Sequence, residues 1–444
     1  MAEPARIPDF TFVHAADLHL DTPFKGIGVA SESVAARLRE ASFGAFDSLV
    51  NLCLERSASF LVIAGDLYDG PERGLRAQLH LRDGLARLSQ AGIASFVVHG
   101  NHDPVETGWS ALGGPWPEGV SIFGAGTVKA VPVVVDGTTV ATLQGVSFAK
   151  RAERENLALG FSHSAGPGIQ VGLLHCNVGG AASGYDDYSP CTLEDLGRIG
   201  LDYWALGHIH SEMILSGGAG LGEPWVVYSG CLQSRSAKPS ERGPKGAVVV
   251  QVRNGKVAEI ESVACDVIRF DLVEIDITDL ADLAELRDVM ASTARDALSA
   301  ADGRSLVLDG QLVGRSGLHL DLAHRGAAQE LLDTLRNDFS DTDPFCWWNG
   351  IEDKSRPVLD IAAARQGSDF AADLITLADE LRASVTRDPT ALSTLVDELS
   401  DGLPARVRNA RTLDKMFASE TSGVDELIER ALLLALDELD SGSY

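Results

Sequence analysis

The chain has 444 residues, which is enough for two or three domains rather than one. Hydrophobic residues make up 45% of it and charged residues 23%, so the chain can bury a sizeable core. No stretch approaches the roughly 20 consecutive apolar residues of a membrane-spanning helix. Residues 1–10 lack the apolar region of a secretory signal. We therefore expect a cytoplasmic protein without a membrane partner.

Charge and cysteine usage constrain the partners and the compartment. The six cysteines are scattered without a CxxC pair, which fits buried thiols in a reducing compartment. The net charge of −27 disfavours binding of nucleic acid by the molecule as a whole. However, from Ile268 onward 17 basic residues face 35 acidic ones, so this part carries −18 of the total. A nucleic-acid substrate therefore stays open, although charge gives it no support.

The first hundred residues are predicted to form a βαβαβ segment. The expected elements are strands at 10–16, 60–64 and 94–99 and helices at 32–56 and 75–90. Strands that alternate with helices indicate a parallel sheet. Each of these strands ends in a polar cluster, and ligands of open α/β sheets bind outside the carboxyl ends of the strands. We therefore expect the three clusters to converge.

From residue 120 onward the pattern changes to shorter strands punctuated by glycine. One helix is expected at 192–198, and strands are expected at 131–135, 140–145, 169–174, 203–206, 226–229, 247–252 and 257–263. We predict that these strands form a second, mainly antiparallel layer.

After about Cys265 the polar motifs stop, and the pattern indicates two further parts. Strands at 268–277 and 306–312 and helices at 280–300 and 323–338 predict a small α+β unit. The remainder is helical, with an apolar stripe at Phe370, Leu374, Leu377 and Leu381 and a second apolar helix at 424–439. We expect an α/β protein with a first domain at 9–266 that carries the polar clusters, an α+β capping domain at 267–362 and a helical C-terminal region at 366–444.

Side chains with metal-binding chemistry follow five of the predicted strands. Divalent cations take carboxylate, amide and imidazole donors, and the sequence places such donors at Asp17, His19, Asp66, Asn101, His175, His208 and His210. Asp17 and His19 are two residues apart, as are the last two histidines, so each pair points to one side of an extended segment. Seven donors suffice for two metals if Asp66 bridges them. Two ions about 3.5–4 Å apart can hold the attacking and the leaving oxygen of a phosphoester.

The order of these motifs resembles the calcineurin-like metallophosphoesterase signature. Asp-x-His, Gly-Asp-x-x-Asp, Gly-Asn-His-Asp, a later His and Gly-His-x-His follow one another along the chain. A single such motif is common background, and a lone histidine after a strand is more often a core residue. Five in order, each after a predicted strand, favour the metal centre.

The resemblance implies a four-layer α/β/β/α fold and a role for each residue. One metal would be held by Asp17, His19, Asp66 and His210, and the other by Asp66, Asn101, His175 and His208. His102 would contact the scissile phosphate and protonate the leaving oxygen. Asp103 would orient His102, as a carboxylate commonly fixes an imidazole.

The sequence around the motifs is similar to DNA repair exonucleases of the SbcD/YhaO type. The similarity is carried by the segments 17–26, 188–196, 202–210 and 228–235, the last followed by Glu241 and the segment 243–246, and it covers about residues 10–265. It implies a DNA exo- or endonuclease that uses two divalent metals, with Mn²⁺ expected before Fe²⁺ or Zn²⁺. It also implies a homodimer and an SMC-like ATPase partner of the SbcC or YhaN type, docked on the C-terminal helices. The default interpretation of these apolar stripes is a helical cap that packs on its own domain.

One residue departs from the pattern of the wider family. Some relatives carry a histidine where this chain has Asp69, so we do not expect a second catalytic histidine, and Asp69 is expected to brace its loop.

Basic residues near the motifs have two interpretations: they bind backbone phosphates, or they belong to solvated surface loops. The main group is Arg235, Lys238, Arg242 and Lys245, a second group is Lys150, Arg151 and Arg154, and weaker candidates are Lys25 and Tyr185.

Two other functions compete with the nuclease. A phosphodiesterase of the same fold for small nucleotides is disfavoured by the long segment after Cys265 and by the similarity to the exonucleases. A non-catalytic subunit that only docks an ATPase is disfavoured by the intact donor set and by the presence of His102. Activity on small diesters alone would favour the first alternative.

Overall fold

The computed structural model describes most of the chain up to residue 387 and a few residues near its end. The described residues are 7–24, 31–69, 74–107, 115–163, 168–179, 187–217, 224–324, 326–358, 361–367, 369–387, 428, 431–433 and 435–436. The chain divides into two compact units, Met1–Arg356 and Pro357–Tyr444.

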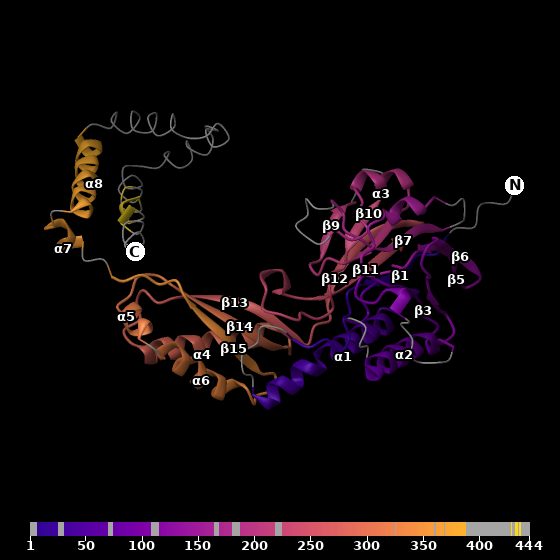
Figure 1. Cartoon of the computed structure of the whole chain (residues 1–444), viewed down its shortest axis with the longest axis horizontal. Coiled ribbons are helices and arrows are strands. Elements are labelled where there is room, and N and C mark those ends of the chain that lie inside the picture. The colour runs from indigo at the N-terminus through magenta and orange to yellow at the C-terminus, as the bar shows by residue number, and fades with distance from the viewer. Residues whose placement is uncertain are drawn as a thin grey trace. The chain divides into compact units, whose positions relative to one another are not determined.

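The first sheet of the larger unit has six strands in the order β12-β11-β1-β2-β3-β4. Figure 1 labels β12, β11, β1 and β3 of this sheet. These strands are β1 (Phe10–Ala15), β2 (Phe60–Ala64), β3 (Ala94–Val98), β4 (Val120–Ile122), β11 (Gly246–Arg253) and β12 (Lys256–Ala264). The strands β1 to β3 are parallel, as predicted, and β4, which was not predicted in this sheet, is parallel to β3. The strands β11 and β12 run antiparallel to their neighbours. Helices α1 (Glu32–Glu55) and α2 (Leu75–Gln90) pack on one face of this sheet.

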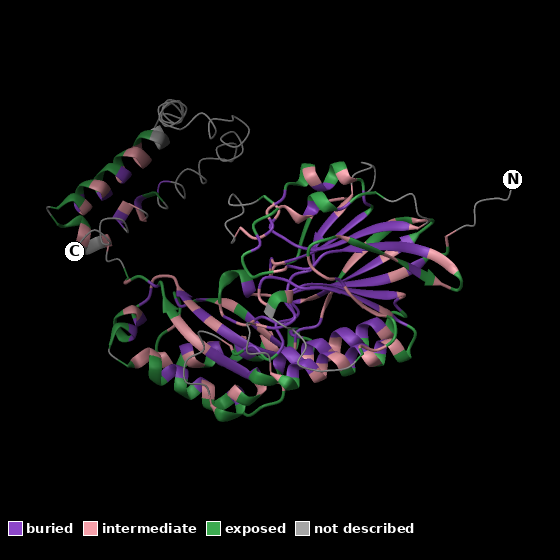
Figure 2. Ribbon diagram, turned by 45° about the vertical axis from the view of Figure 1, so that its right-hand side comes forward, coloured by how far each residue is buried: buried purple, intermediate pink, exposed green. Residues whose placement is uncertain are grey.

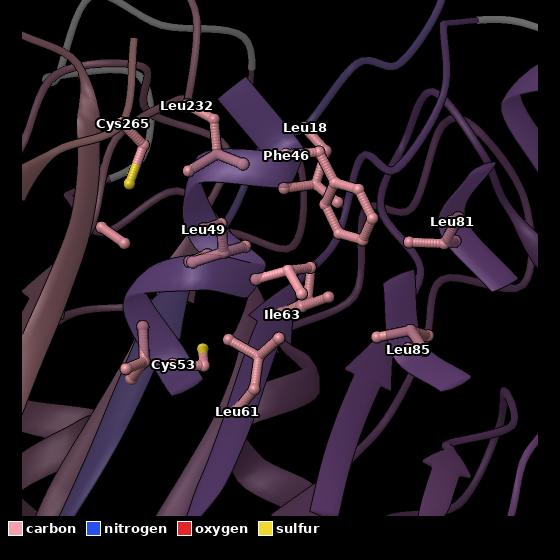
Figure 3. Close-up of a cluster of buried hydrophobic side chains, with 14 of the residues drawn as sticks. Leu18, Phe46, Leu49, Cys53, Leu61, Ile63, Leu81, Leu85, Leu232 and Cys265 are labelled. Carbon is pink, nitrogen blue, oxygen red and sulfur yellow. The ribbon is translucent and has the colours of Figure 1, made fainter. Parts of the chain in front are cut away.

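The core under these two helices is built from their apolar stripes and from the sheet. Phe46 and Leu49 of α1 and Leu81 of α2 meet Leu61 and Ile63 of β2, and all are at most 1% exposed (Figure 3). Burial of a large apolar side chain contributes about 1.5–3 kcal/mol, so this layer holds β2 firmly against both helices.

The second sheet has the order β5-β6-β7-β8-β10-β9. Its strands are β5 (Lys129–Val135), β6 (Thr138–Gly145), β7 (Ile169–His175), β8 (Tyr203–Gly207), β9 (Met213–Ser216) and β10 (Trp225–Tyr228). Helix α3 (Leu193–Ile199) covers its outer face, where Leu196 packs against Leu174 and Trp204. The inner faces of the two sheets share one apolar core, and the strands away from the sheet edges are mostly buried (Figure 2). The four-layer α/β/β/α fold is therefore confirmed.

The predicted second layer is wrong in two respects. Its four central strands, β6, β7, β8 and β10, are parallel, and only the edge strands β5 and β9 are antiparallel. In addition, β11 and β12 belong to the first sheet, where β11 pairs with β1. The three successive residues Val248, Val249 and Val250 are all buried because β11 has a core on both faces. Such a run does not reveal which sheet a strand joins.

The rest of the larger unit is a three-stranded parallel sheet, which we call the cap sheet. It is formed by β13 (Ile268–Asp276), β14 (Ser305–Val313) and β15 (Cys346–Asp353), and one face packs on α4 (Leu283–Ala300), α5 (Leu318–Ala323) and α6 (Ala327–Phe339). The prediction missed β15, where Asn349 and Gly350 interrupt the apolar pattern and the register shifts.

The opposite face of the cap sheet receives the N-terminal half of α1. Val34 and Leu38 of this helix pack against Phe270, Val307 and Trp347 of the three strands. A single helix thus contributes to the core below the first sheet and to the core beside the cap sheet. This shared helix fixes the cap sheet relative to the first sheet.

The smaller unit contains α7 (Ile361–Arg365) and α8 (Phe370–Arg387). Ile375 and Ala378 are buried there together with Ile428, Leu432 and Leu436, which belong to the predicted helix at 424–439. Most of that helix lies outside the described residues. The predicted stripe on α8 is wrong in part, because Phe370 and Leu377 are 62% and 51% exposed. Within the described part of the chain, no helix combines the length and apolarity that a membrane span requires.

Candidate metal centre

The strand ends of both sheets meet at one place. Asp17, Asp66 and Asn101 follow β1, β2 and β3 of the first sheet. His175 ends β7 and His208 follows β8 in the second sheet. Donor atoms of Asp17, Asp66 and His175 lie within 4.8 Å of one another, and the Asn101 Oδ1 lies 3.0 Å from the His175 Nε2. The predicted convergence of the strand ends is therefore confirmed. His19 and His210 complete the cluster from the same loops.

The backbone is shaped to let these loops approach. Asp17, His19 and Asp66 have φ angles of 51°, 43° and 52°, a region that non-glycine residues rarely adopt and that recurs at functional sites. The amides of Asp17 and His19 each donate a 3.0 Å hydrogen bond to a carbonyl of the β2 loop. At Gly207 a Cβ atom would collide with the carbonyl oxygen of Ala64. Glycine in the Gly-His-x-His motif therefore permits the close contact between the two sheets.

Four donors form one side of the cluster. The His19 Nε2 lies 3.3 Å from the His210 Nε2 and 3.7 Å and 4.0 Å from carboxylate oxygens of Asp66 and Asp17. Two donors that each lie about 2.1 Å from one metal ion are about 3–4 Å apart. The spacing of this group therefore fits a single bound cation.

A second group lies on the other side of Asp66. The His175 Nε2 lies 3.0 Å from the Asn101 Oδ1 and 3.5 Å from the Asp66 Oδ2. The Nδ1 of His175 donates to the Ala64 carbonyl at 2.8 Å, which leaves the Nε2 lone pair facing the group. The His208 ring packs edge-on against His175, with ring centroids 5.3 Å apart. Asp66 reaches both groups, which is the position that a bridging carboxylate needs.

The electrostatics of the cluster suit divalent cations. Burial raises the pKa of Asp17 well above its usual value, and the charge of Asp66 raises it further. Burial also raises the pKa of Asp66. Burial lowers the pKa of His175 to about 4 and that of His19 well below its ordinary value, so both rings are neutral. Two mutually repelling buried carboxylates among neutral imidazoles gain stability from bound cations, so the donor set fits two divalent metals.

His102 lies at the edge of the cluster and pairs with Asp69. Its Nδ1 is hydrogen-bonded to the Asp69 Oδ1, and its side chain is 26% exposed, in contrast to the fully enclosed ring of His19. Burial lowers the pKa of His102, but the hydrogen bond to Asp69 and the charge of Asp66 outweigh it and raise the pKa overall. The ring is thus fixed at one nitrogen beside the metal ligands.

The expectation that Asp103 orients His102 is wrong. The Asp103 carboxylate accepts hydrogen bonds from the amides of Gly100 and Leu67, at 2.7 and 3.1 Å, and from the Nδ1 of His99, at 3.1 Å. It is fully buried and therefore shapes the loop after β3 instead of touching the reactive side. Asp69, from the loop after β2, takes the role that we predicted for Asp103.

Glu241 is a functional residue that sequence reasoning missed. Its Oε1 accepts from the His210 Nδ1 at 3.3 Å, and its Oε2 accepts from the backbone amides of Arg235 and Ser236. Burial raises the pKa of Glu241, but the hydrogen bond from His210 and the amides outweigh it and lower the pKa to about 2. The permanent carboxylate therefore orients the imidazole of His210, a predicted metal ligand. Its spacing from His210 gave no sign of this contact.

The four basic residues of the following loop have different positions. Arg235 donates to the Asp69 Oδ2 at 3.2 Å, whereas Arg242 reaches the Asp309 Oδ2 of the cap sheet at 3.4 Å. Lys238 is exposed at the start of a 3-10 helix, η4 (Pro239–Glu241). Lys245 is buried, and its Nζ donates to a backbone carbonyl, so the prediction of a phosphate contact at Lys245 is wrong. Only Arg235 lies beside the His102 pair.

The second basic group has one member near the cluster. The Arg154 guanidinium lies over the Tyr188 ring, 5.5 Å from its centroid, and that ring packs edge-on against His208 at 5.6 Å. Lys150 and Arg151 are exposed. The weaker candidates Lys25 and Tyr185 lie outside the described residues.

Comparison with known proteins identifies the family of the chain. The family model of calcineurin-like phosphoesterases matches residues 10–212. The uncharacterized metallophosphoesterase YhaO of Bacillus subtilis is 33% identical over 349 residues, which cover 79% of this chain and 83% of that protein. The chain belongs to the calcineurin-like metallophosphoesterases. A second family model, the middle domain of metallophosphoesterase YhaO, matches residues 270–356 of this metallophosphoesterase, which include the cap sheet.

More distant relatives of this metallophosphoesterase include DNA double-strand break repair proteins named Mre11. The protein of Thermoplasma acidophilum is 26% identical over 53% of this chain and 62% of its own length. That of Haloferax volcanii is 26% identical over 60% and 54%, respectively. Among solved structures, a dimetal phosphatase from Danio rerio aligns with 59% of this chain and all of its own, at 13% identity and a TM-score of 0.33. A nuclease of Pseudomonas putida aligns at 15% identity over 48% of this chain and 71% of its own, with a TM-score of 0.20. Neither TM-score is high enough to carry an argument.

Proposed function

We propose that this metallophosphoesterase is a metal-dependent DNA nuclease that hydrolyses phosphodiester bonds by exo- or endonucleolytic cleavage. The observation that carries the proposal is the two-sided donor cluster around Asp66, with the partly exposed His102–Asp69 pair beside it. The similarity to the Mre11 repair proteins supports DNA as the substrate.

The roles of the side chains follow from their contacts. Asp17, His19, Asp66 and His210 would hold one divalent metal, and Asp66, Asn101, His175 and His208 would hold the other. When bound, the two metals supply positive charge for the phosphate and acidify water. His102 offers its free Nε2 to the leaving oxygen, because its Nδ1 is held by Asp69.

Mn²⁺, a role in DNA repair in the cytoplasm, a homodimer and an SMC-like ATPase partner belong to the same proposal. Phe370 and Leu377 on α8 are exposed, which suits docking of a partner on the helical region. Replacement of both residues by serine is expected to abolish co-purification of the ATPase with the full chain. Unchanged co-purification would contradict docking at α8.

The test of the nuclease is the cleavage of end-labelled linear DNA by the purified full chain with Mn²⁺. The wild type is expected to shorten the DNA, and Asp66→Ala and His102→Ala are expected to fail. His102→Ala should still bind metal, because His102 is not part of the donor set. His80→Ala is the matched control, since its ring pairs with Asp47 on the helical layer and should leave cleavage unchanged.

The outcome of this cleavage assay distinguishes the proposed nuclease from the phosphodiesterase for small nucleotides and from the docking subunit. Hydrolysis of a small nucleotide diester without cleavage of DNA would keep the metal centre and overturn the DNA assignment. Failure on both substrates, alone and with the ATPase partner, would favour the docking subunit without catalysis.

A further inference from the structure

Arg235 lies directly behind the His102–Asp69 pair. Its guanidinium donates to the Asp69 Oδ2 at 3.2 Å, while the other carboxylate oxygen of Asp69 is bonded to the His102 Nδ1. The Arg235 side chain is 16% exposed, less than the 26% of His102. Arg235, Asp69 and His102 therefore form a chain in which the imidazole is the member most open to solvent.

The backbone of Arg235 is fixed on the metal side. The carboxylate of Glu241 accepts a hydrogen bond from the Arg235 amide and another from His210, a predicted metal ligand. The position of the guanidinium is thus tied to the position of the metal cluster.

The same loop is also fixed on the side of the cap sheet. The side-chain amide of Gln233 accepts from the amides of Val267 and Ile268 and donates to the carbonyl of Ile268. With both sides anchored, the loop has little freedom, and Arg235 is held in place to act on Asp69.

We propose that Arg235 is a positioning residue that acts through Asp69 to aim His102 at the leaving oxygen. The proposal rests on the proposed role of His102 as the proton donor. A carboxylate that binds imidazole through one oxygen can still rotate about its own bond. A guanidinium on its second oxygen removes that rotation, and a displacement of about 1 Å at a reacting group can lower a rate about 100-fold.

The proposed reaction is the attack of a water molecule on the phosphodiester. The oxygen of water forms a bond to phosphorus, and the bond between phosphorus and the leaving oxygen breaks. The leaving oxygen takes a proton from the His102 Nε2, the attacking water loses one proton to solvent, and His102 regains a proton from solvent. A leaving group that is stable as an anion needs little help from His102, whereas a basic one needs the proton.

The experiment compares two leaving groups that differ in basicity. The full chain with Mn²⁺ is tested on two esters of thymidine 5′-phosphate, the 4-nitrophenyl ester and the more basic phenyl ester. In Arg235→Met, kcat is expected to fall about 10-fold or more for the phenyl ester and less than about 2-fold for the nitrophenyl ester, with KM unchanged. Arg235→Lys should recover part of the loss. Arg56→Met, which removes a surface guanidinium paired with Glu261, is the matched control.

Several results would overturn the proposal. An equal loss on both esters with a raised KM would make Arg235 a phosphate anchor. A loss of bound Mn²⁺ in Arg235→Met would mean that Arg235 is a structural part of the metal centre. An unchanged kcat on the phenyl ester would mean that Arg235 has no role in the reaction. A wild type that splits the esters but not DNA refutes the nuclease and leaves the test of Arg235 intact.

Discussion

At the scale of single residues, one carboxylate that is not a predicted ligand supports the candidate metal centre. Glu241 holds the His210 ring and two backbone amides. Glu241→Ala is expected to weaken binding of Mn²⁺ about 10- to 100-fold, because the imidazole loses its orientation and its basicity. Calorimetric titration of the metal-free chain with Mn²⁺ measures this change. Glu194→Ala, which removes an exposed carboxylate on α3, should leave the affinity unchanged. An equal affinity in both variants would refute the role of Glu241.

Two glycines provide a matched pair. Gly207→Ala would force a methyl group against the carbonyl oxygen of Ala64, where one sheet meets the other, and is expected to cost about 1–3 kcal/mol of unfolding free energy. Gly197 lies within α3, and no neighbouring atom lies within 4 Å of the Cβ that alanine would add. Gly197→Ala should therefore stabilise the chain by about 0.5–1 kcal/mol. Urea unfolding of both variants tests the contrast, and equal effects would contradict the close approach at Gly207.

The sequence predicted the donors of this site but not the contacts behind them. Asp17, His19 and Asp66 carry a signal because they stand directly after apolar strands. No sequence signal marks Asp69 as the partner of His102. Asp103 is adjacent to His102 in sequence, whereas Asp69 lies 33 positions away and is brought close by the pairing of β2 with β3. Contacts of this kind depend on the relative placement of loops, which no local pattern encodes.

At the scale of elements, His14 links β1 of the first sheet to β8 of the second. Its Nδ1 is bonded to the Tyr203 hydroxyl at 3.0 Å and its Nε2 to the Leu206 carbonyl at 3.2 Å. Burial lowers the pKa of His14 to about 3, from 6.5 in the unfolded chain. Below about pH 6.5 the unfolded chain takes up a proton that the folded chain refuses, so the stability that neutral His14 contributes is lost as the pH falls toward 3.

His14→Gln removes this ionisable group. Between about pH 7 and pH 5, the unfolding free energy of the wild type is expected to fall about 2 kcal/mol more than that of His14→Gln. Urea unfolding at both pH values measures the difference. Parallel losses in the two proteins would show that His14 does not remain neutral between the sheets.

The elements that could be predicted were those with a clear period. The helices α1 and α2 and the strands β1 to β3 were predicted within one or two residues, because apolar spacing and strand-end motifs agree there. The sheet membership of β11 was not predictable, since its valines are buried on both faces and pair with β1, more than 200 residues away. On α8 the buried face includes Ile375 and Ala378, which cluster with Ile428, Leu432 and Leu436. The apolar spacing of α8 alone does not show which side such residues cover.

At the scale of the whole molecule, charge and chemistry are separated along the chain. The donor cluster, His102 and Arg235 all precede Ile268, while −18 of the net charge of −27 follows from that residue onward. An acidic protein can therefore bind a polyanionic substrate at the proposed metal centre, because bound divalent cations would neutralise the carboxylates of the donor cluster.

The larger of the two units is expected to fold and to act without residues 357–444. The donor cluster, the His102–Asp69 pair and the five apolar clusters of the larger unit consist of residues before Arg356. A chain that ends at Arg356 is therefore expected to fold, to bind Mn²⁺ and to hydrolyse the nitrophenyl ester of thymidine 5′-phosphate within about 2-fold of the full chain, because a unit with its own core can fold alone. Circular dichroism and initial rates measure this. Loss of the folded signal on truncation would mean that residues 357–444 complete the core of the larger unit, and a folded but inactive fragment would mean that they complete its active site.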